Sequence, residues 1–333
     1  MFKLTRALSI LAFSGLFFAS LFAQVKDREI EKPKDYATPV LERSPELQTI
    51  LSGAINDLLK RDPSFKPEQV TATLIDLRDA SKLKIADVRG ENKIYPASVV
   101  KMFYMAALER QLADKKITLT AEMTRGMMDM IVDSSNEATQ YILDVLTDTS
   151  SGAELPQKEF EAWQNKRNRV NRFYTSLAYT NINVNQKTFC EDAYGIEQQS
   201  RNYQGQNRNM LTTNATARLL AEIALRRFVS ETRSNMMLDL MKRDWSKPST
   251  DTDNQAVGFT GKALIDGKMT GTKLWSKAGW TSTARHDAAY IETPEGLKFV
   301  LVVFTENHAN DREAIPSVAA KVMQGMREVV LVK

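Results

Sequence analysis

The residues best suited to chemistry lie in the run YPASVVK at positions 95–101, which continues as the apolar segment MFYMAAL. Ser98 and Lys101 are three residues apart, hence neighbours on one face of a helix. A serine hydroxyl is a weak nucleophile, and a lysine amine becomes its base when burial or a nearby cation lowers the lysine pKa. A helix that is apolar on nearly every face is a buried helix, which favours such a pair. On this segment alone, a capping serine and a lysine that extends to solvent explain the same residues, and that alternative stays open.

Two further groups of polar residues follow along the chain. The run DSSN at 133–136 comes after the amphipathic segment MTRGMMDMIV, and KAGW at 277–280 comes after the strand-like TKLWS. Each is ordinary when taken alone, because Ser, Asp and Asn favour helix caps and turns. Glycine at a strand end needs no catalytic explanation either. Neither group indicates a function by itself.

Taken in order, the three groups resemble the S-x-x-K, S-D-N and K-T-G motifs of class A β-lactamases and penicillin-binding proteins. YPASVVK supplies the first motif, SSN the second and KAG the third. The run MLTTNATARLLAEI at 210–223 also looks like the helix that follows the active-site loop in that superfamily. The resemblance covers roughly residues 44–330. It implies a serine hydrolase of the class A β-lactamase or penicillin-binding-protein type.

The resemblance implies a role for each matched polar side chain. Ser98 would attack an amide or β-lactam carbonyl, and Lys101 would take its proton directly or through a water. Ser134 would relay that proton to the leaving nitrogen. Asn136 would hold Lys101 and the side-chain amide of the substrate. Lys277 would attract the substrate carboxylate and help to lower the pKa of Lys101.

The third motif also implies backbone contacts to the substrate. The N–H groups of Ser98 and Trp280 would form an oxyanion hole, in which one donor contributes roughly 3–4 kcal/mol in comparable hydrolases. Gly279 would let the substrate backbone lie against the strand edge. Ala278 stands where the family has Thr or Ser, so a hydroxyl for the substrate carboxylate is missing. Arg285 on the next strand would compensate for it, with a plain surface charge as the alternative.

The loop that would hydrolyse the acyl-enzyme departs from the family pattern. Class A enzymes carry a glutamate in an E-x-x-L-N sequence there, and no E-x-x-L-N occurs in this chain. The corresponding stretch offers Glu191, Asp192 and Glu197, of which Glu191 lies nearest the expected place. Glu191 is therefore the candidate deacylation base, and a solvated loop charge is the alternative. An insertion at about 148–176 also makes the helical part larger than a compact class A enzyme requires.

The elements around these groups predict one α/β domain over residues 44–330. The fold expected is an antiparallel sheet built from N- and C-terminal segments and flanked by helices, with an inserted all-helical subdomain at about 113–245. This is the architecture of β-lactamases and DD-peptidases. The strands are expected at 70–77, 82–88, 272–278, 284–292 and 298–305. The helices outside the helical middle are expected from Pro45, over 98–112 and over 311–330.

The N-terminus is typical of an export signal. Residues 1–23 combine the basic MFKLTR, about sixteen apolar residues and a small residue at Ala23. Cleavage there would make the protein secreted or periplasmic, with no stable membrane span. An uncleaved anchor is the alternative, although the apolar stretch is slightly short for one. The charged residues 24–43 are expected to form a flexible tether.

Composition excludes several classes of protein. The 333 residues are 43% hydrophobic and 26% charged with only 14 Gly and 10 Pro, which excludes collagen-like and wholly disordered chains. Removal of Lys3 and Arg6 with the signal leaves 43 basic against 41 acidic residues, a net charge of +2 that gives no case for a nucleic-acid partner. The sole cysteine, Cys190, is expected to be a structural thiol. Two histidines without metal-ligand spacing predict no metal and no cofactor, with His286 packing in the core. We expect a monomer.

Three functions fit these observations. The leading one is an exported class A β-lactamase that opens β-lactam amides through an acyl-enzyme on Ser98. The second is a D-alanyl-D-alanine peptidase, a penicillin-binding protein that acts on peptidoglycan stem peptides. The third is a non-catalytic protein that binds a muropeptide or a β-lactam. The intact motif set argues against the third, because a binder needs no nucleophile together with its base.

Overall fold

The structure is a computed structural model that describes residues 28–331 of the chain. The expected signal peptide of residues 1–23 lies outside the described residues. In the part of the chain that is described, no helix is long and apolar enough to cross a membrane.

A single mixed sheet forms the centre of the described fold. Its strands are β1 (Leu41–Arg43), β2 (Val70–Asp76), β3 (Leu83–Val88), β4 (Lys242–Arg243), β5 (Lys273–Trp280), β6 (Ala284–Glu292) and β7 (Lys298–Glu306). They lie in the order β1-β3-β2-β7-β6-β5-β4. Every neighbouring pair is antiparallel except β1 and β3, which are parallel. The expected sheet of N- and C-terminal segments is confirmed, with the short parallel edge strand β1 as an addition.

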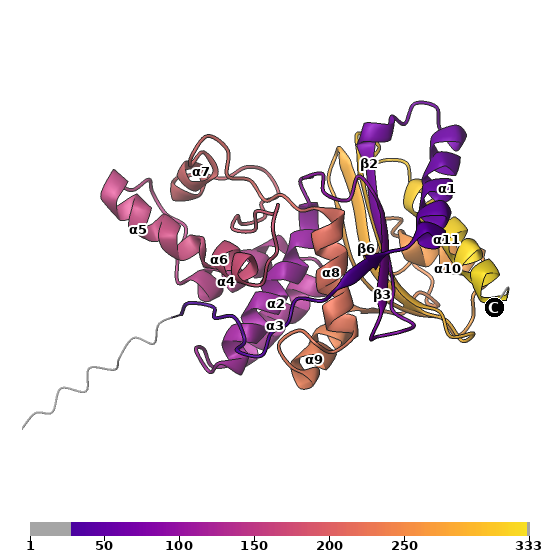
Figure 1. The fold of residues 1–333 in the computed structure, drawn as a ribbon. Coiled ribbons are helices and arrows are strands. Elements are labelled where there is room, and N and C mark those ends of the chain that lie inside the picture. The colour runs from indigo at the N-terminus through magenta and orange to yellow at the C-terminus, as the bar shows by residue number, and fades with distance from the viewer. Residues whose placement is uncertain (1–27, 332–333) are drawn as a thin grey trace, which may run out of the picture.

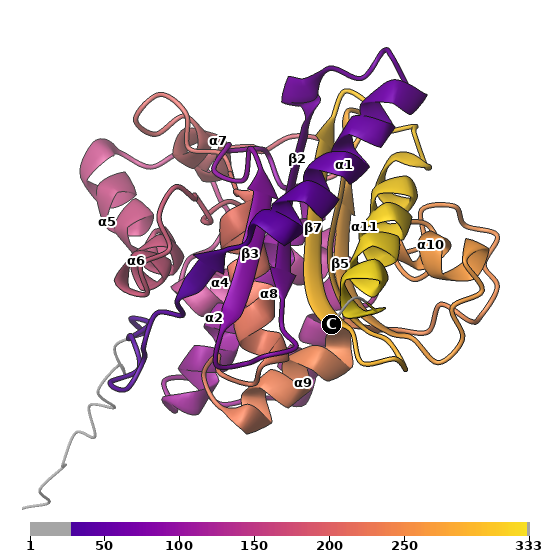
Figure 2. The ribbon, with the colours of Figure 1, turned by 45° about the vertical axis from the view of Figure 1, so that its right-hand side comes forward.

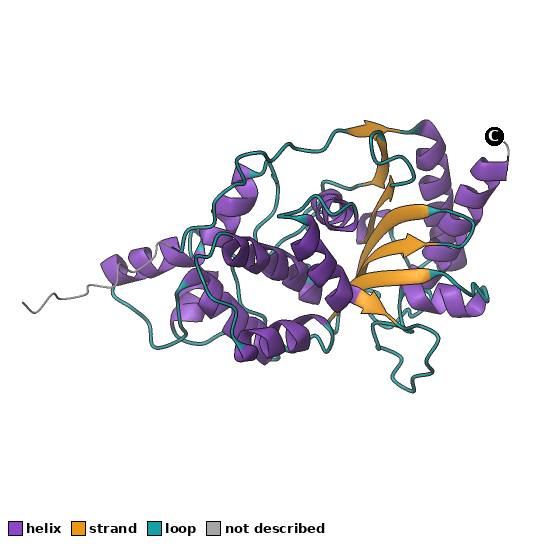
Figure 3. Cartoon of the chain, turned by 90° about the horizontal axis from the view of Figure 1, so that it is seen from below, coloured by secondary structure: helices purple, strands orange, loops and turns teal. Residues whose placement is uncertain are grey.

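Helices cover both faces of the sheet, and strand alternation decides which residues meet them. On β7, Phe299, Leu301 and Val303 pack toward one face and Val300, Val302 and Phe304 toward the other. The first face is covered by α1 (Pro45–Arg61), α10 (Thr260–Asp266) and α11 (Ala314–Leu331). The second is covered by α2 (Val100–Ala113) and α8 (Thr213–Ala224). Figures 2 and 3 show the strands between these two groups of helices.

The chain leaves the sheet after β3 and returns to it at β4, so the helical segment between them is one insertion. Its other helices are α3 (Ala121–Ile131), α4 (Asn136–Thr147), α5 (Gln157–Arg167), α6 (Arg169–Ser176), α7 (Ile196–Arg201) and α9 (Glu231–Met241). Two 3-10 turns, η1 (Pro67–Gln69) and η2 (Ala97–Val99), precede β2 and α2. Helices α5, α6 and α7 lie farthest from the sheet, at the left of Figure 1. Helices α5 and α6 fall within the stretch that the sequence marks as extra.

The prediction of a flexible tether over 24–43 is wrong for residues 28–43. Ile30 is buried, and the Tyr36 hydroxyl donates a hydrogen bond of 2.9 Å to Glu222 on α8. Glu29 pairs with Arg172 on α6 at 2.7 Å. The segment then ends in β1. Three of the charges that suggested solvent exposure, those of Arg28, Glu29 and Glu31, instead have partners on the helical part, which a single-sequence pattern does not reveal.

Candidate active site

Ser98 stands in η2, directly before the buried helix α2. Ala97, the residue before it, is buried and has a φ of 47°, in the left-handed region that disfavours side chains with a Cβ. Such a backbone costs of order 1–3 kcal/mol and persists where the surroundings impose it. The strained turn therefore marks the entry to α2 as a constrained position, and Ser98 is half-buried there.

The surroundings that impose this turn are the end of β5 and the side chain of His286. A Cβ on Gly279 would lie 2.7 Å from the Ser98 nitrogen and 2.9 Å from the Pro96 oxygen, so only glycine permits this approach. His286 on β6 accepts a hydrogen bond from Thr305 N at Nδ1, which leaves Nε2 to donate to the Tyr95 carbonyl at 2.9 Å. Burial lowers the pKa of His286 to about 4 and keeps the ring neutral. The expectation that His286 packs rather than reacts agrees with these contacts.

Lys101 is fully buried and is held by the second motif. Its Nζ donates to Asn136 Oδ1 at 2.8 Å and to the Ser134 carbonyl at 2.5 Å, and lies 3.3 Å from Ser134 Oγ. Burial lowers the pKa of Lys101 to about 7, against the opposing charge of Glu137. A large fraction of the amine is therefore unprotonated at neutral pH, as a general base requires.

Ser134 lies between two amines. Its φ of 59° is left-handed, and the chain reverses there between α3 and α4. Ser135, which replaces the family aspartate, caps α4 by accepting a hydrogen bond from Ala138 N at 3.1 Å. Lys277 Nζ donates to Ser134 Oγ at 3.0 Å, so both amines reach this hydroxyl. The hydroxyl of Ser134 can thus exchange a proton with either amine.

Lys277 is fully buried on β5. Burial, and next the charges of Lys101 and Arg243, lower its pKa well below the usual value for lysine. A substrate carboxylate would act in the opposite direction, since a negative charge favours the ammonium form. Trp280, at the end of the same strand, is 38% exposed and its ring lies 5.8 Å from Phe259. The oxyanion hole of the Ser98 and Trp280 N–H groups stays a prediction.

Gln255 is a site residue that sequence reasoning missed. Its Oε1 accepts hydrogen bonds from Lys277 Nζ at 2.7 Å and from Ala278 N at 3.1 Å. Its Nε2 donates to the carbonyls of Val132 at 2.8 Å and Ile131 at 3.2 Å. One neutral amide therefore joins the end of α3 to β5 and orients Lys277 without neutralising it. A glutamine in the polar loop before α10 carries no motif that could have identified it.

Replacement of Gln255 by glutamate is expected to weaken recognition of carboxylate-bearing substrates. The new carboxylate would lie beside Lys277, raise its pKa and compete with the substrate for it. We expect the apparent Kd for benzylpenicillin before acylation to rise about tenfold or more, because an ion pair within the protein replaces one with the substrate. Stopped-flow acylation over a range of penicillin concentrations measures this, with Gln324→Glu on the exposed face of α11 as the matched control. An unchanged apparent Kd in Gln255→Glu would contradict the role of Gln255.

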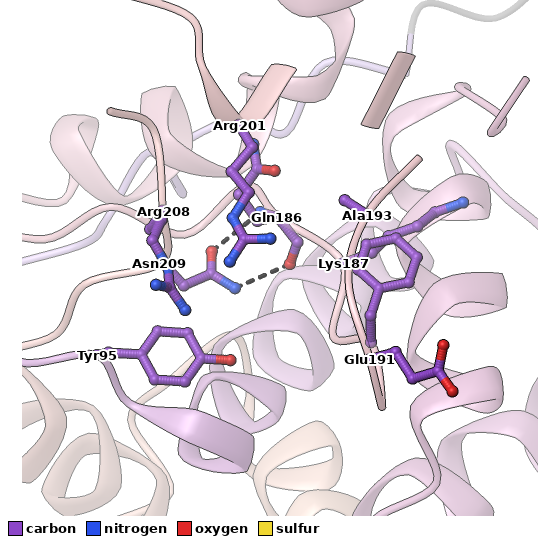
Figure 4. A pocket seen from close by; sticks show the side chains of 9 residues that line it. Tyr95, Gln186, Lys187, Glu191, Ala193, Arg201, Arg208 and Asn209 are labelled. Atoms are coloured by element: carbon purple, nitrogen blue, oxygen red, sulfur yellow. Dashed lines mark hydrogen bonds between the residues drawn. The ribbon is translucent and has the colours of Figure 1, made fainter. Parts of the chain in front are cut away.

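The loop expected to hold a deacylation base places Cys190, rather than Glu191, beside Asn136. Cys190 is exposed, its Sγ accepts a hydrogen bond of 3.4 Å from Asn136 Nδ2, and it is close enough to act on the pKa of Lys101. Cys190 thus lies against a motif residue at the surface, and its assignment as a structural thiol stays a prediction. Glu191 is exposed and lines a neighbouring pocket with Tyr95 (Figure 4). In the described residues, no carboxylate is hydrogen-bonded to Lys101 or Asn136.

The other two acidic residues of this loop are engaged in ion pairs. Asp192 pairs with Arg201, and Glu197 is buried against Arg167 at 2.7 Å and Lys187 at 3.3 Å. Arg167 is fully buried on α5 and Lys187 lies within the loop. Removal of one partner from such a buried network costs about 3–5 kcal/mol. The network fixes the loop to the extra helices and leaves neither acid free to position a water.

Arg285 is not brought to the group around Lys101. It is 1% exposed, its guanidinium pairs with Asp253 at 2.7 Å and donates to the Gly258 carbonyl at 2.7 Å, and it lies 4.0 Å from the Phe259 ring centre. These contacts tie β6 to the loop before α10. These contacts occupy the two Nη atoms of Arg285, whereas its buried Nε has no partner, so the expectation that Arg285 replaces the missing hydroxyl of Ala278 stays a prediction. The described residues also contain no group of His, Cys, Asp and Glu suited to a metal ion.

Comparisons with known proteins agree with this arrangement. The sequence model of the beta-lactamase enzyme family matches residues 51–326. Similar solved structures include a beta-lactamase from Sphaerobacter thermophilus DSM 20745, 18% identical with a TM-score of 0.59 over 85% of this chain and 98% of that one. PBP-A is also 18% identical, with a TM-score of 0.59 over 88% and 100% of the two chains. A PBP-A mutant in an acyl-enzyme complex with penicillin G is 18% identical, with a TM-score of 0.58 over 87% and 99%. No curated protein sequence matches the chain.

Proposed function

The chain belongs to the beta-lactamase enzyme family, and on that premise we propose that Ser98 is the nucleophile that β-lactams and peptide amides acylate. The observation that carries the proposal is the buried Lys101, whose amine contacts Ser134 and Asn136 one helical turn from Ser98. Lys101 takes the Ser98 proton as the Oγ attacks the carbonyl carbon. Ser134 passes a proton to the leaving nitrogen as the amide C–N bond breaks. Lys277 donates a hydrogen bond to the Ser134 hydroxyl and is the second amine in contact with it.

The fate of the acyl-enzyme separates the two enzymatic functions. A class A β-lactamase needs a base that positions a water against the ester, and a carboxylate is the usual one. The described residues place the thiol of Cys190 against Asn136 instead. This observation favours a penicillin-binding D-alanyl-D-alanine peptidase over a rapid β-lactamase. The acyl-enzyme complex of a PBP-A mutant with penicillin G supports the same chemistry by analogy of fold.

The experiment that tests the proposal is intact-protein mass spectrometry after mixing with benzylpenicillin. We expect a covalent adduct that forms at once and persists. An adduct that disappears within seconds would favour the β-lactamase. The absence of any adduct at all would favour the non-catalytic binder and contradict the proposal.

The rate of acylation is expected to rise with pH through about 7. Only the unprotonated amine of Lys101 accepts the Ser98 proton, and burial sets its pKa to about 7. The unprotonated fraction is therefore small below this pH and nearly complete above it. Stopped-flow measurement of acylation from pH 5.5 to 9 tests this. A rate constant that does not change across the range would contradict Lys101 as the base.

Replacement of Cys190 by glutamate is expected to shorten the lifetime of the penicilloyl-enzyme. It would place a carboxylate beside Asn136, where it can position a water, and general-base catalysis contributes about 10²–10⁴-fold. The release of penicilloate measures the lifetime, with Cys190→Ser as the control that adds no base. Glu191→Gln should leave the lifetime unchanged. If Glu191→Gln lengthens the lifetime of the penicilloyl-enzyme and Cys190→Glu does not shorten it, Glu191 would be restored as the base.

We propose further that residues 1–23 direct export and are removed, since their pattern is that of a signal peptide. An N-terminal sequence of the purified protein that starts near Gln24 would support this. Retention of Met1 on protein recovered from outside the cytoplasm would contradict it.

A further inference from the structure

A second pocket, of about 630 Å³, lies beside α5 and α6 and is completed by three loops, which contain Lys93, residues 183–185 and residues 203–210. Nine of its fourteen lining residues carry a side-chain amide, and Met210 is its only aliphatic one. Ligand pockets in proteins are mostly apolar with a few polar groups, so a wall of amides is an unusual composition. The proposed chemistry at Ser98 does not use this pocket.

The floor of the pocket is a network of asparagines that bond to one another. Asn171 Nδ2 donates to Asn168 Oδ1 at 2.7 Å and to Asn183 Oδ1 at 2.6 Å. Asn207 Oδ1 accepts from Asn183 at 2.9 Å and from Asn185 at 3.0 Å. Each amide has both a donor and an acceptor, so these bonds distinguish the oxygen of each side chain from its nitrogen. The polar groups that face the pocket are therefore held in place before any ligand arrives.

Three polar groups on the wall have no partner in the described protein. Gln164 is 4% exposed; its Oε1 accepts from Ser200 at 2.6 Å, whereas its Nε2 donates to nothing. Asn168 Nδ2 and the Tyr203 hydroxyl are likewise unpaired, and the Tyr203 ring is held edge-on to Phe160 at 5.7 Å. None of these three atoms is among the fully buried polar atoms that lack a partner, so each is open to solvent. A ligand with acceptor atoms in the pocket would take the place of the water that they otherwise bind.

We infer that this pocket binds a sugar, an N-acetylated one being the best fit. Hydroxyl and acetamide oxygens accept from the free donors, and the Tyr203 ring offers a flat face for the sugar ring. A peptide would need apolar subsites for its side chains, and the wall offers little apolar surface. A phosphate would repel the carboxylate of Glu161, which leaves the wall a net charge of only +1 from Lys93 and Arg208. An uncharged ligand rich in hydroxyl groups matches the composition best.

The pocket lies within reach of the nucleophile. Lys93 lines it and is five residues before Ser98, so the two Cα atoms are at most about 18 Å apart. Arg208 lines both this pocket and the smaller one of Figure 4, where its guanidinium lies 4.6 Å from the Tyr95 ring centre. A short peptide spans that length. If Ser98 acts as proposed above, the substrate is a peptide linked to a sugar. The sugar is held in this pocket and the scissile amide lies at Ser98.

Two measurements on the full-length mature protein test this inference. Calorimetry with an N-acetylglucosamine tetramer is expected to show binding that weakens about tenfold or more in Tyr203→Ala and in Gln164→Met. Gln324→Met on α11 is the control. The ratio kcat/KM for a disaccharide-linked pentapeptide should exceed that for the free pentapeptide about tenfold. In both variants the difference in kcat/KM between the two peptides should disappear, while the rate of acylation by penicillin changes less than twofold.

The outcomes separate the pocket from the chemistry. No binding of the tetramer to the wild-type protein would overturn the sugar site. Equal losses for the free and the sugar-linked peptide in Tyr203→Ala would assign the pocket to a peptide and overturn it as well. Failure of penicillin to acylate Ser98 would remove the proposed function, but binding of the tetramer would still decide the pocket. Should Gln164→Met fail to fold, Tyr203→Ala at the half-buried rim gives the result alone.

Discussion

Ser98→Ala is expected to abolish covalent labelling by a fluorescent penicillin while the fold stays intact. The Ser98 hydroxyl is the only atom that the proposal acylates, so its loss removes the reaction rather than slowing it. Within the described protein the side chain makes no hydrogen bond, so alanine leaves no buried partner unsatisfied. Gel fluorescence after incubation with the labelled penicillin measures the loss, and thermal unfolding by circular dichroism confirms the fold.

A matched control for this substitution is Ser317→Ala on α11, whose hydroxyl bonds only the Ala314 carbonyl in its own helix. It should label as the wild type does. Labelling of Ser98→Ala at the wild-type rate would remove Ser98 as the nucleophile.

Lys101→Ala is expected to slow acylation by about 10²–10⁴-fold, the usual contribution of a general base. Lys277→Ala should instead act mainly on binding, because a cation that attracts the substrate carboxylate contributes to the ground state and the transition state alike. Stopped-flow traces over a range of penicillin concentrations separate the acylation rate constant from the apparent binding constant. Equal effects of both variants on both parameters would contradict this division of roles.

The lowered pKa that lets Lys101 act as a base follows from the surroundings of its amine. Its pKa falls from 10.5 to about 7, which corresponds to roughly 5 kcal/mol in favour of the neutral amine. A hydrogen bond that involves a charged group contributes about 1.5–3 kcal/mol, so the contact to Asn136 does not restore the ordinary pKa. Burial therefore dominates, and the strained backbones at Ala97 and Ser134 are part of the fold that maintains it.

Much of the fold was predictable from local patterns. The strands expected at 284–292 and 298–305 match β6 and β7 to within one residue, because apolar residues dominate both and a Pro-Glu-Gly turn separates them. Strands β1 and β4 were missed, since two or three residues are too few for a periodic signal. The buried helix after Ser98 was predictable because its apolar run leaves no polar face.

The catalytic side chains were predictable where a motif fixes their spacing, and not where tertiary contacts decide. Lys101 and Ser134 are in contact as the motif set implies. In contrast, the sequence does not say whether Cys190 or Glu191 faces Asn136, because a shift of one residue along the loop would exchange their positions. The roles of Gln255 and Arg285 depend on partners distant along the chain, which no local pattern contains.

Tryptic mapping of the penicillin adduct tests the central claim most directly. Cleavage after Lys and Arg isolates IYPASVVK, residues 94–101, in which Ser98 is the sole serine. Two other side chains at the site carry a hydroxyl or thiol that a penicillin could acylate, and they fall on different peptides, Ser134 on 126–158 and Cys190 on 188–201. The account predicts that the penicilloyl mass is carried by residues 94–101 and that tandem fragmentation places it on Ser98. Attachment to Cys190 or to Ser134 would contradict it.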